Sequence, residues 1–341
     1  MDGPVLVSGA SGFLGRHLLE ALRVRDPRSD VLALVRDAEA WRQAGWTQSL
    51  GPIDTVAGSV TEPSRWTDDE RLKGLSGVFH LAAVVKHSRW DTRDVYTTNL
   101  AGTLHMVRLA AAHGCRLVFL STSGTVGCFR SPDEWADERS PYCESEVSSW
   151  PYYDSKIQAE REARRLAEEL GVDLVIVRPP VLLGPGDHRL RSSANVLRFL
   201  RRKLPFLIRG GIHFVDVRDV AEAVLRAMAL PRARPVYHLP GTVCGIESFF
   251  AMLEQVSGVR APRARLPFRA AWLLAWAAQR LGVLLRGEPL GLLPDPVVIE
   301  MAARYWDVRS LYAADELGYK PRDGVETLAD TVRWLRENAR S

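Results

Sequence analysis

The stretch "VLVSGASGFLG", residues 5–15, constrains the fold more than any other part of the chain. An apolar run typical of a buried strand leads into a cluster of small residues, in which Gly9, Gly12 and Gly15 stand three apart. The helical periodicity of "GRHLLEALRV" follows at once. Such glycines let the backbone approach a pyrophosphate, and the helix N-terminus presents free N–H groups to the phosphates. Strand, glycine turn and helix in this order predict a dinucleotide-binding site in an α/β sheet.

Alternating strands and helices predict the rest of the fold. Further apolar, strand-like runs occur at 31–35, 54–58, 78–83, 117–121 and 174–179, with helical stretches between most of them. This pattern indicates a doubly wound parallel sheet of the Rossmann type, covered by helices on both faces. After about residue 179 the rhythm breaks. We expect a nucleotide-binding domain over 1–180, with 212–240 returning to it, and a smaller, mostly helical substrate lobe formed by 181–211 and 241–341.

Composition excludes several other classes of protein. The 45 basic and 41 acidic residues leave a net charge of +4, too little to indicate a nucleic-acid partner. The eight histidines form no HxH or HxxxH pair and the four cysteines no CxxC pair, so no metal site is expected. Reduced thiols, and an N-terminal stretch too short for a signal peptide, favour a cytoplasmic protein.

The stretch "PYYDSKIQAE" carries the expected catalytic pair. Tyr152 and Lys156 are four residues apart and so share one helix face, whereas Tyr153 does not have this spacing. An ammonium beside a phenol favours the phenolate and lowers its pKa, which suits proton exchange with a carbonyl or alcohol. Upstream, "LVFLSTSGTVG" ends a strand in hydroxyl residues, one of which can hold the substrate oxygen.

These motifs resemble the extended short-chain dehydrogenase/reductases. The resemblance covers roughly residues 5–221 and is carried, in the order of that family, by "SGASGFLG", "FHLAA", "NLAGT", "STSGTVG", "YYDSK", "RPPVLLGPGD" and "FVDVRDVA". Within the family, the chain looks most like dihydroflavonol 4-reductases and 3β-hydroxysteroid dehydrogenases. The resemblance implies that Tyr152 is the acid/base, Lys156 its partner and Asn99 a support of the proton path. Counting back from Val126, as in sugar epimerases, gives Ser123 as the orienting hydroxyl, which we prefer, whereas matching "SxxGTV", as in dihydroflavonol reductases, gives Thr122.

The same resemblance implies a set of cofactor contacts. They comprise the glycine turn and the positions matching the family's later motifs: Gly9, Ser11, Gly12, Phe13, Leu14, Gly15, Arg16, Arg36, Ser59, Val60, Leu81, Ala82, Ala83, Tyr152, Lys156, Pro179 and Val181. Arg36 follows the second strand, where an arginine meets the 2′-phosphate of NADP(H), so NADP(H) is expected rather than NAD(H). The family usually has an aspartate near the adenine where this chain has Ser59.

The expected activity is NADP(H)-dependent interconversion of a carbonyl and an alcohol on an apolar small molecule, of sterol, polyketide or aryl ketone type. A nucleotide-sugar epimerase or dehydratase with tightly held NAD is one alternative, and a non-catalytic NADP-binding sensor is another. The apolar segment 266–293 suggests a substrate lid, with a helix between lobes or in a homodimer as a close second alternative. Its part 270–285 is too short for a bilayer span, which leaves contact with a membrane surface as a further option.

Overall fold

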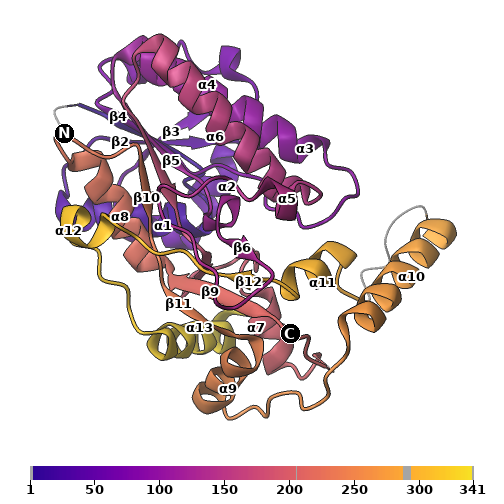
Figure 1. The fold of residues 1–341 in the computed structure, drawn as a ribbon. Helices are drawn as coiled ribbons and strands as arrows, with labels where there is room; N and C mark the ends of the chain where they lie inside the picture. The colour runs from indigo at the N-terminus through magenta and orange to yellow at the C-terminus, as the bar shows by residue number, and fades with distance from the viewer. Residues whose placement is uncertain (1–2, 205, 287–292, 340–341) are drawn as a thin grey trace.

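A seven-stranded, fully parallel sheet forms the centre of the molecule (Figure 1). The computed structural model describes residues 3–204, 206–286 and 293–339. The strands lie in the order β10-β7-β5-β4-β1-β2-β3. Their bounds are β1 (Val5–Ser8), β2 (Val31–Val35), β3 (Asp54–Ala57), β4 (Gly77–His80), β5 (Arg116–Leu120), β7 (Leu174–Arg178) and β10 (Val236–His238). This doubly wound α/β sheet is the architecture that the sequence predicts.

The central strands are buried on both faces, as their continuous apolar runs indicate. In β1, Val5 and Val7 pack against helices α1 and α8, whereas Leu6 packs on the opposite face against α4 and α6. The two helix layers are visible on either side of the sheet in Figure 1. The α-helices are α1 (Phe13–Arg25), α2 (Ala38–Gln43), α3 (Arg93–Tyr96), α4 (Gly102–His113), α5 (Glu144–Val147), α6 (Pro151–Leu170), α7 (Ala194–Leu200), α8 (Val217–Ala229), α9 (Ile246–Ser257), α10 (Phe268–Arg286), α11 (Pro296–Ala302), α12 (Ala313–Leu317) and α13 (Gly324–Asn338).

Local sequence signals explain where the long helices begin and end. Pro151 occupies the first turn of α6, where its missing N–H is not needed, and Gly171 ends the helix with φ +69°. Helix α4 ends in the same way at Gly114, with φ +60°. Gly12 is the N-cap of α1 and has no side chain to cap the helix, so the first N–H groups of α1 keep no side-chain partner.

A smaller part of the molecule packs against the end of the main sheet. It contains a three-stranded sheet in the order β11-β9-β8 and a two-stranded sheet of β12 and β6. The bounds are β6 (Cys128–Phe129), β8 (Val181–Leu183), β9 (Gly211–Asp216), β11 (Thr242–Gly245) and β12 (Tyr305–Trp306). Strand β9 pairs with β8 and β11 in the smaller sheet, whereas β10 belongs to the main sheet.

The strand order reverses beside β1, and sheets of this kind have their ligand-binding crevice at the carboxyl end of the strands at this point. Helix α1 leads from β1 to β2 on one side, while β4 and β5 lie on the other. In such sheets ligands bind at this reversal, outside the carboxyl ends of the strands. The segments following β1, β2, β4 and β5 therefore meet at one edge of the sheet, and these segments carry most of the predicted site residues.

Candidate active site

The glycine turn packs too closely for side chains. Gly9 has φ +75°, and a Cβ at this position would lie 2.6 Å from the Ala82 nitrogen. A Cβ on Gly15 would lie 2.3 Å from the Gly9 carbonyl oxygen, so helix α1 lies directly against the turn. The segment after β4 therefore crosses the turn at backbone distance. The sequence run 78–83 continues as a strand only to His80 because the next residues make this crossing.

The first turn of α1 faces this crevice. Phe13 and Leu14 begin the helix, and Leu14 is buried in the core, so only the backbone of Leu14 can serve a ligand. The uncapped N–H groups, together with the helix dipole, form a site that suits phosphate. The glycine turn and the free helix end therefore fit the pyrophosphate of a dinucleotide.

Cations gather around the same turn. The Arg189 guanidinium donates to the Ser11 hydroxyl over 3.2 Å, although the two residues are far apart in sequence. Arg16 contacts the His188 imidazole, lies over the Trp46 ring and pairs with a glutamate one helical turn further on. The segment after β8 thus brings positive charge to the phosphate end of the site.

Two neighbouring residues at the end of β2, Arg36 and Asp37, have different surroundings. Arg36 is exposed, whereas the Asp37 carboxylate accepts hydrogen bonds from the Glu39 and Ala40 N–H groups, at 3.0 and 2.9 Å. Asp37 is therefore the N-cap of α2. Its charge is directed to that helix, and the guanidinium of Arg36 is left at the strand tip.

The remaining predicted cofactor contacts lie around the same sheet edge. Ser59 bonds to the Thr61 hydroxyl over 2.8 Å, and Val60 packs so tightly against helix α4 that a Cβ on Gly102 would meet its side chain at 2.7 Å. Pro179 accepts a hydrogen bond from the Ser123 N–H over 2.9 Å, and Val181 is partly exposed at the start of β8. The Ser59 hydroxyl is therefore bonded to a residue two positions away in the sequence.

Tyr152 lies in the first turn of α6, beside the hydroxyl-rich segment after β5. Burial raises the pKa of Tyr152 to about 12, and a hydrogen bond with the Thr122 hydroxyl opposes this rise. Ser123 is buried in a short 3₁₀ turn, Ser123–Thr125, directly after Thr122. The structure brings Tyr152 and Thr122 into contact. Tyr153, by contrast, packs in the core, where a Cβ on Gly124 would meet its ring at 2.1 Å.

Lys156 is buried one helical turn further along α6. Its ammonium donates to the Leu120 carbonyl over 2.8 Å and lies 4.5 Å from the Phe119 ring centroid. Burial lowers the pKa of Lys156 to about 7, and the charge of Glu160 opposes this shift. The sequence argument expected the lysine to lower the pKa of Tyr152. Burial dominates both groups instead, and moves their pKa values in opposite directions.

Asn99 lies in a π-helical turn, Thr97–Ala101, between α3 and α4. Its Oδ1 accepts from the Val84 N–H over 2.8 Å, and its Nδ2 donates to the Val84 carbonyl and to the Ser155 hydroxyl, each over 3.0 Å. Asn99 therefore joins the segment after β4 to the helix that carries Tyr152. Single π turns of this kind occur frequently at functional sites.

His87 was missed by sequence reasoning, which considered histidines only as metal ligands. Its ring lies edge-on to Tyr152, with centroids 5.4 Å apart, and stacks on Tyr153 at 6.0 Å. Burial lowers the pKa of His87 to about 4, so the imidazole is neutral near pH 7. Among the described residues, its Nδ1 has no hydrogen-bond partner. No periodic signal marks this histidine, because it lies in an irregular segment.

A buried ion pair and the hydrogen bonds around it connect α6 with the segment after β5, the two parts of the chain that carry most of the catalytic candidates. Glu160 and Arg178 approach to 2.5 Å, and both are buried. Glu160 also accepts hydrogen bonds from the hydroxyls of Ser121, over 2.5 Å, and Tyr142, over 3.0 Å. Because Ser121 directly precedes Thr122, this network fixes the end of β5 relative to α6.

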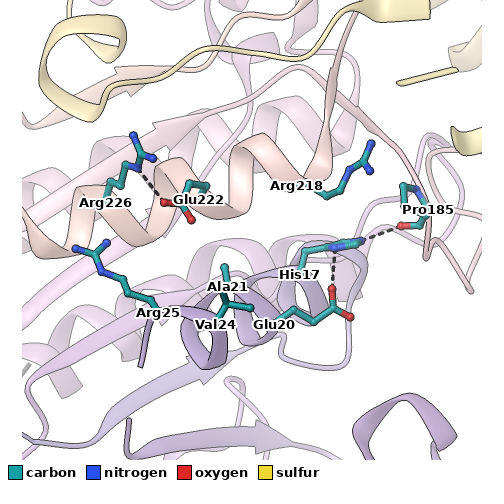
Figure 2. A pocket seen from close by; sticks show the side chains of 9 residues that line it. All are labelled: His17, Glu20, Ala21, Val24, Arg25, Pro185, Arg218, Glu222 and Arg226. Carbon is teal, nitrogen blue, oxygen red and sulfur yellow. Dashed lines mark hydrogen bonds and ion pairs between the residues drawn. The ribbon is translucent and has the colours of Figure 1, made fainter. Parts of the chain in front are cut away.

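A surface groove between α1 and α8 lies apart from these residues (Figure 2). Two arginines of its lining are paired with carboxylates: Arg218 contacts Asp216 at 2.6 Å, and Arg226 contacts Glu222 at 2.9 Å. None of the catalytic candidates lines this groove. The candidate active site is therefore the crevice at the carboxyl edge of the sheet.

Comparison with known proteins agrees with this geometry. The sequence pattern of the NAD dependent epimerase/dehydratase family matches residues 5–239. The chain belongs to this family. It is 32% identical to a putative dihydroflavonol 4-reductase of Synechocystis sp., over 97% of this chain and 94% of that protein. It is 27% identical to the sterol demethylase protein B of Methylococcus capsulatus, over 97% and 98% of the two chains.

A solved structure described as gox2253 has the same fold. It superposes with a TM-score of 0.81 at 27% identity and covers 99% of each chain. As a member of the epimerase/dehydratase family with reductase relatives, the protein is an NAD(P)-dependent enzyme of the extended short-chain dehydrogenase/reductase type, and an oxidoreductase.

Proposed function

We propose that the protein reduces a ketone or aldehyde on an apolar small molecule to the alcohol, with NADPH as the reductant. The observation that carries this proposal is the position of Tyr152, in the first turn of α6 beside the hydroxyl-rich segment that follows β5 at the carboxyl edge of the sheet. Because burial raises the pKa of Tyr152 to about 12, the phenol keeps its proton at neutral pH. A protonated phenol in contact with a second hydroxyl, at the edge where dinucleotides bind, is an acid ready to protonate a carbonyl oxygen.

The side chains around the crevice then have separate tasks. Tyr152 donates its proton to the carbonyl oxygen as this oxygen gains negative charge. Thr122 hydrogen bonds to the same oxygen and orients it; its contact with Tyr152 supports Thr122 over Ser123, which remains the alternative. Lys156, which donates to the Leu120 carbonyl, would bind a ribose hydroxyl, and Asn99 holds α6 and the segment after β4 in position. When bound, the nicotinamide supplies the hydride that reaches the carbonyl carbon.

The glycine turn and the N-terminus of α1 support a dinucleotide as the cofactor, and the nearby arginines support NADP(H). Gly9 and Gly15 leave room only for backbone, and the free end of α1 receives the pyrophosphate. Arg36 meets the 2′-phosphate at the tip of β2, since a guanidinium forms paired, charge-assisted hydrogen bonds with phosphate. Asp37 does not oppose this, because it caps α2. Arg16 adds positive charge on the same side.

An apolar substrate is supported by the relatives and by the second lobe. The two curated relatives carry names that refer to a flavonoid reductase and to sterol demethylation. The segment 266–293, of which residues 287–292 lie outside the described part, approaches the site through Trp272, which donates to Glu300 beside Trp150. We assign residues 1–180 to cofactor binding, together with α8 and β10, and the segments 181–211 and 241–341 to the substrate lobe.

A nucleotide-sugar epimerase is the second candidate. The cationic segment after β8 favours it, because Arg189 and Arg191 could accept a sugar diphosphate. Against it, Arg189 is directed to Ser11 in the glycine turn, and so toward the dinucleotide itself.

One experiment separates the two functions. The freshly purified protein is examined by native mass spectrometry and by absorbance, and is then mixed with NADPH and a panel of apolar ketones. We expect a protein free of cofactor that oxidises NADPH only when a ketone is present. Tightly held NAD that co-purifies with the protein, with no NADPH oxidation on any ketone, would contradict the reductase and support the epimerase.

A further inference from the structure

Helix α10 (Phe268–Arg286) presents large apolar side chains to solvent. We propose that this helix is a docking surface for an anionic lipid bilayer. Leu284 is 82% exposed, Leu285 66% and Leu273 57%, and Leu274 and Leu281 are each at least half exposed. Isolated exposed leucines are ordinary on protein surfaces, but a contiguous set within one helix marks an interaction site. In Figure 1 this helix extends away from the rest of the molecule.

The orientation of α10 makes its exposed face unusual. Its buried side consists of small residues, since Ala271 and Ala275 pack with Ile208 and Ile299. Leu273 and Leu284, eleven residues or about three turns apart, lie opposite these alanines, and Leu274, Leu281 and Leu285 form a second exposed row beside them. The helix therefore buries its small residues and exposes its large ones, the reverse of a helix whose partner is the protein core.

The charge of the segment around α10 indicates which kind of surface the helix binds. Residues 255–287 contain six arginines and no aspartate, glutamate or lysine. Arg269 and Arg280 are exposed on α10 itself, and neither pairs with a carboxylate among the described residues. An apolar helix face bordered by arginines matches a surface of acyl chains and anionic headgroups. A membrane surface offers acyl chains to the leucines and anionic headgroups to the arginines. A second copy of this chain would instead place like charges opposite each other.

Two tryptophans strengthen this assignment. The rings of Trp272 and Trp276 stack with centroids 6.4 Å apart, and the Arg280 guanidinium lies 5.6 Å from the Trp276 ring. Tryptophan and arginine favour the level of the lipid headgroups. Among the described residues, no helix combines the length and hydropathy needed to cross a bilayer. Helix α10 would therefore lie in the plane of the membrane surface.

The N-terminal part of α10 is linked by hydrogen bonds to a residue next to the candidate active site. The Trp272 indole donates to Glu300 over 2.8 Å, and the Trp150 indole donates to the other oxygen of the same carboxylate over 2.7 Å. Trp150 directly precedes α6, which carries Tyr152. A docked α10 thus brings the bilayer close to the crevice, so that an apolar ketone can enter from the lipid. This last step rests on the proposed function, whereas the docking does not.

Vesicle flotation tests the docking without turnover. The full chain is mixed with vesicles of phosphatidylcholine and phosphatidylglycerol in a 7:3 ratio (about 30% anionic lipid, a composition chosen for charge), or of phosphatidylcholine alone. We expect the protein to float with the anionic vesicles and to be released as salt rises. Leu281→Glu with Leu284→Glu should reduce binding by about tenfold or more, because each glutamate adds repulsion and removes apolar area. Val24→Glu is the matched control, since Val24 is 85% exposed on α1.

Every outcome bears on the proposal. Absence of flotation of the wild type, or an equal loss in Val24→Glu, would overturn it. A loss of dimer in the leucine variants without any vesicle binding would assign the surface to a second copy. If the leucine variants do not fold, Arg269→Gln with Arg280→Gln leaves the apolar face intact and should lower anionic binding by roughly 30-fold. Reduction of a water-soluble ketone should not change in any of these variants, which separates docking from catalysis.

Discussion

Tyr152 and Lys156 lie one turn apart on α6, yet burial moves their pKa values in opposite directions, to about 12 and about 7. Both shifts favour the neutral form of the side chain. Near pH 7 the phenol holds its proton while the ammonium begins to lose its own. The pair is therefore set for proton donation by the tyrosine, and the buried lysine carries an energetic cost whenever it is charged.

Removal of the Tyr152 hydroxyl should abolish most of the activity. For Tyr152→Phe we expect a fall of about 10²–10⁴-fold in kcat, the usual contribution of a general acid. NADPH binding and the melting temperature should stay near wild type, because the phenyl ring is kept. The matched control is Tyr153→Phe, which removes a neighbouring hydroxyl in the core. Wild-type turnover by Tyr152→Phe, or an equal fall in both variants, would refute the assignment.

The orienting hydroxyl can be identified by comparing two neighbours. Thr122→Val and Ser123→Ala each remove one hydroxyl with little change of volume. We expect the larger fall, about 10²-fold, in Thr122→Val, because loss of one preorganised donor to a developing oxyanion has about this effect. Initial rates with one ketone decide the question. A larger fall in Ser123→Ala would transfer the role to Ser123, and near-equal rates in both would remove this step from the mechanism.

Cofactor choice should depend on Arg36. Titration of the wild type should show tighter binding of NADPH than of NADH. Arg36→Asp should weaken NADPH by about 10- to 100-fold, since a hydrogen bond to a charged group contributes about 1.5–3 kcal/mol. Arg42→Asp, on the neighbouring helix α2 and paired with Glu39, serves as the control and should leave the ratio unchanged. Equal or tighter binding of NADH by the wild type would contradict the proposal.

The buried Lys156 should make the free energy of unfolding depend on pH. Its folded pKa of about 7 is below its unfolded value, so between pH 7 and about 10 the unfolded chain binds more protons. Stability should therefore rise with pH across this window because of Lys156, by at most about 1.4 kcal/mol per pH unit. Guanidinium unfolding at pH 7, 8 and 9 should show a weaker rise for Lys156→Met than for the wild type. Lys73→Met, at an exposed lysine, should behave like the wild type. Parallel profiles for all three proteins would show that the lysine is not buried.

The sheet could be predicted from the sequence because its strands are continuous apolar runs of the right length. The pattern "VFHLAA" was less informative, since β4 ends at His80 and the next residues cross the glycine turn. That crossing depends on backbone contact with Gly9, which no local periodicity encodes.

The candidate site was only partly visible for a similar reason. Motif spacing predicts that Tyr152 and Lys156 share a helix face, and they do. Spacing says nothing of burial, so it suggested a lowered pKa for Tyr152 where the fold raises it. His87 and Glu300 reach the site through contacts far apart in sequence, from segments without a motif. The capping role of Asp37 could have been predicted from its place just before a helix.

The π-helical turn at Thr97–Ala101 makes the length of this segment as important as its residues. A π turn holds one residue more than an α turn. Deletion of one residue from this turn would restore a regular α-helix and leave α3 and α4 in nearly their present orientation, because the π turn accommodates one extra residue. The wide turn itself would be lost, and Asn99 would no longer be held where its amide reaches both Val84 and Ser155. Loss of one residue here should therefore leave the sheet and its helix layers intact while it releases the segment after β4 from α6.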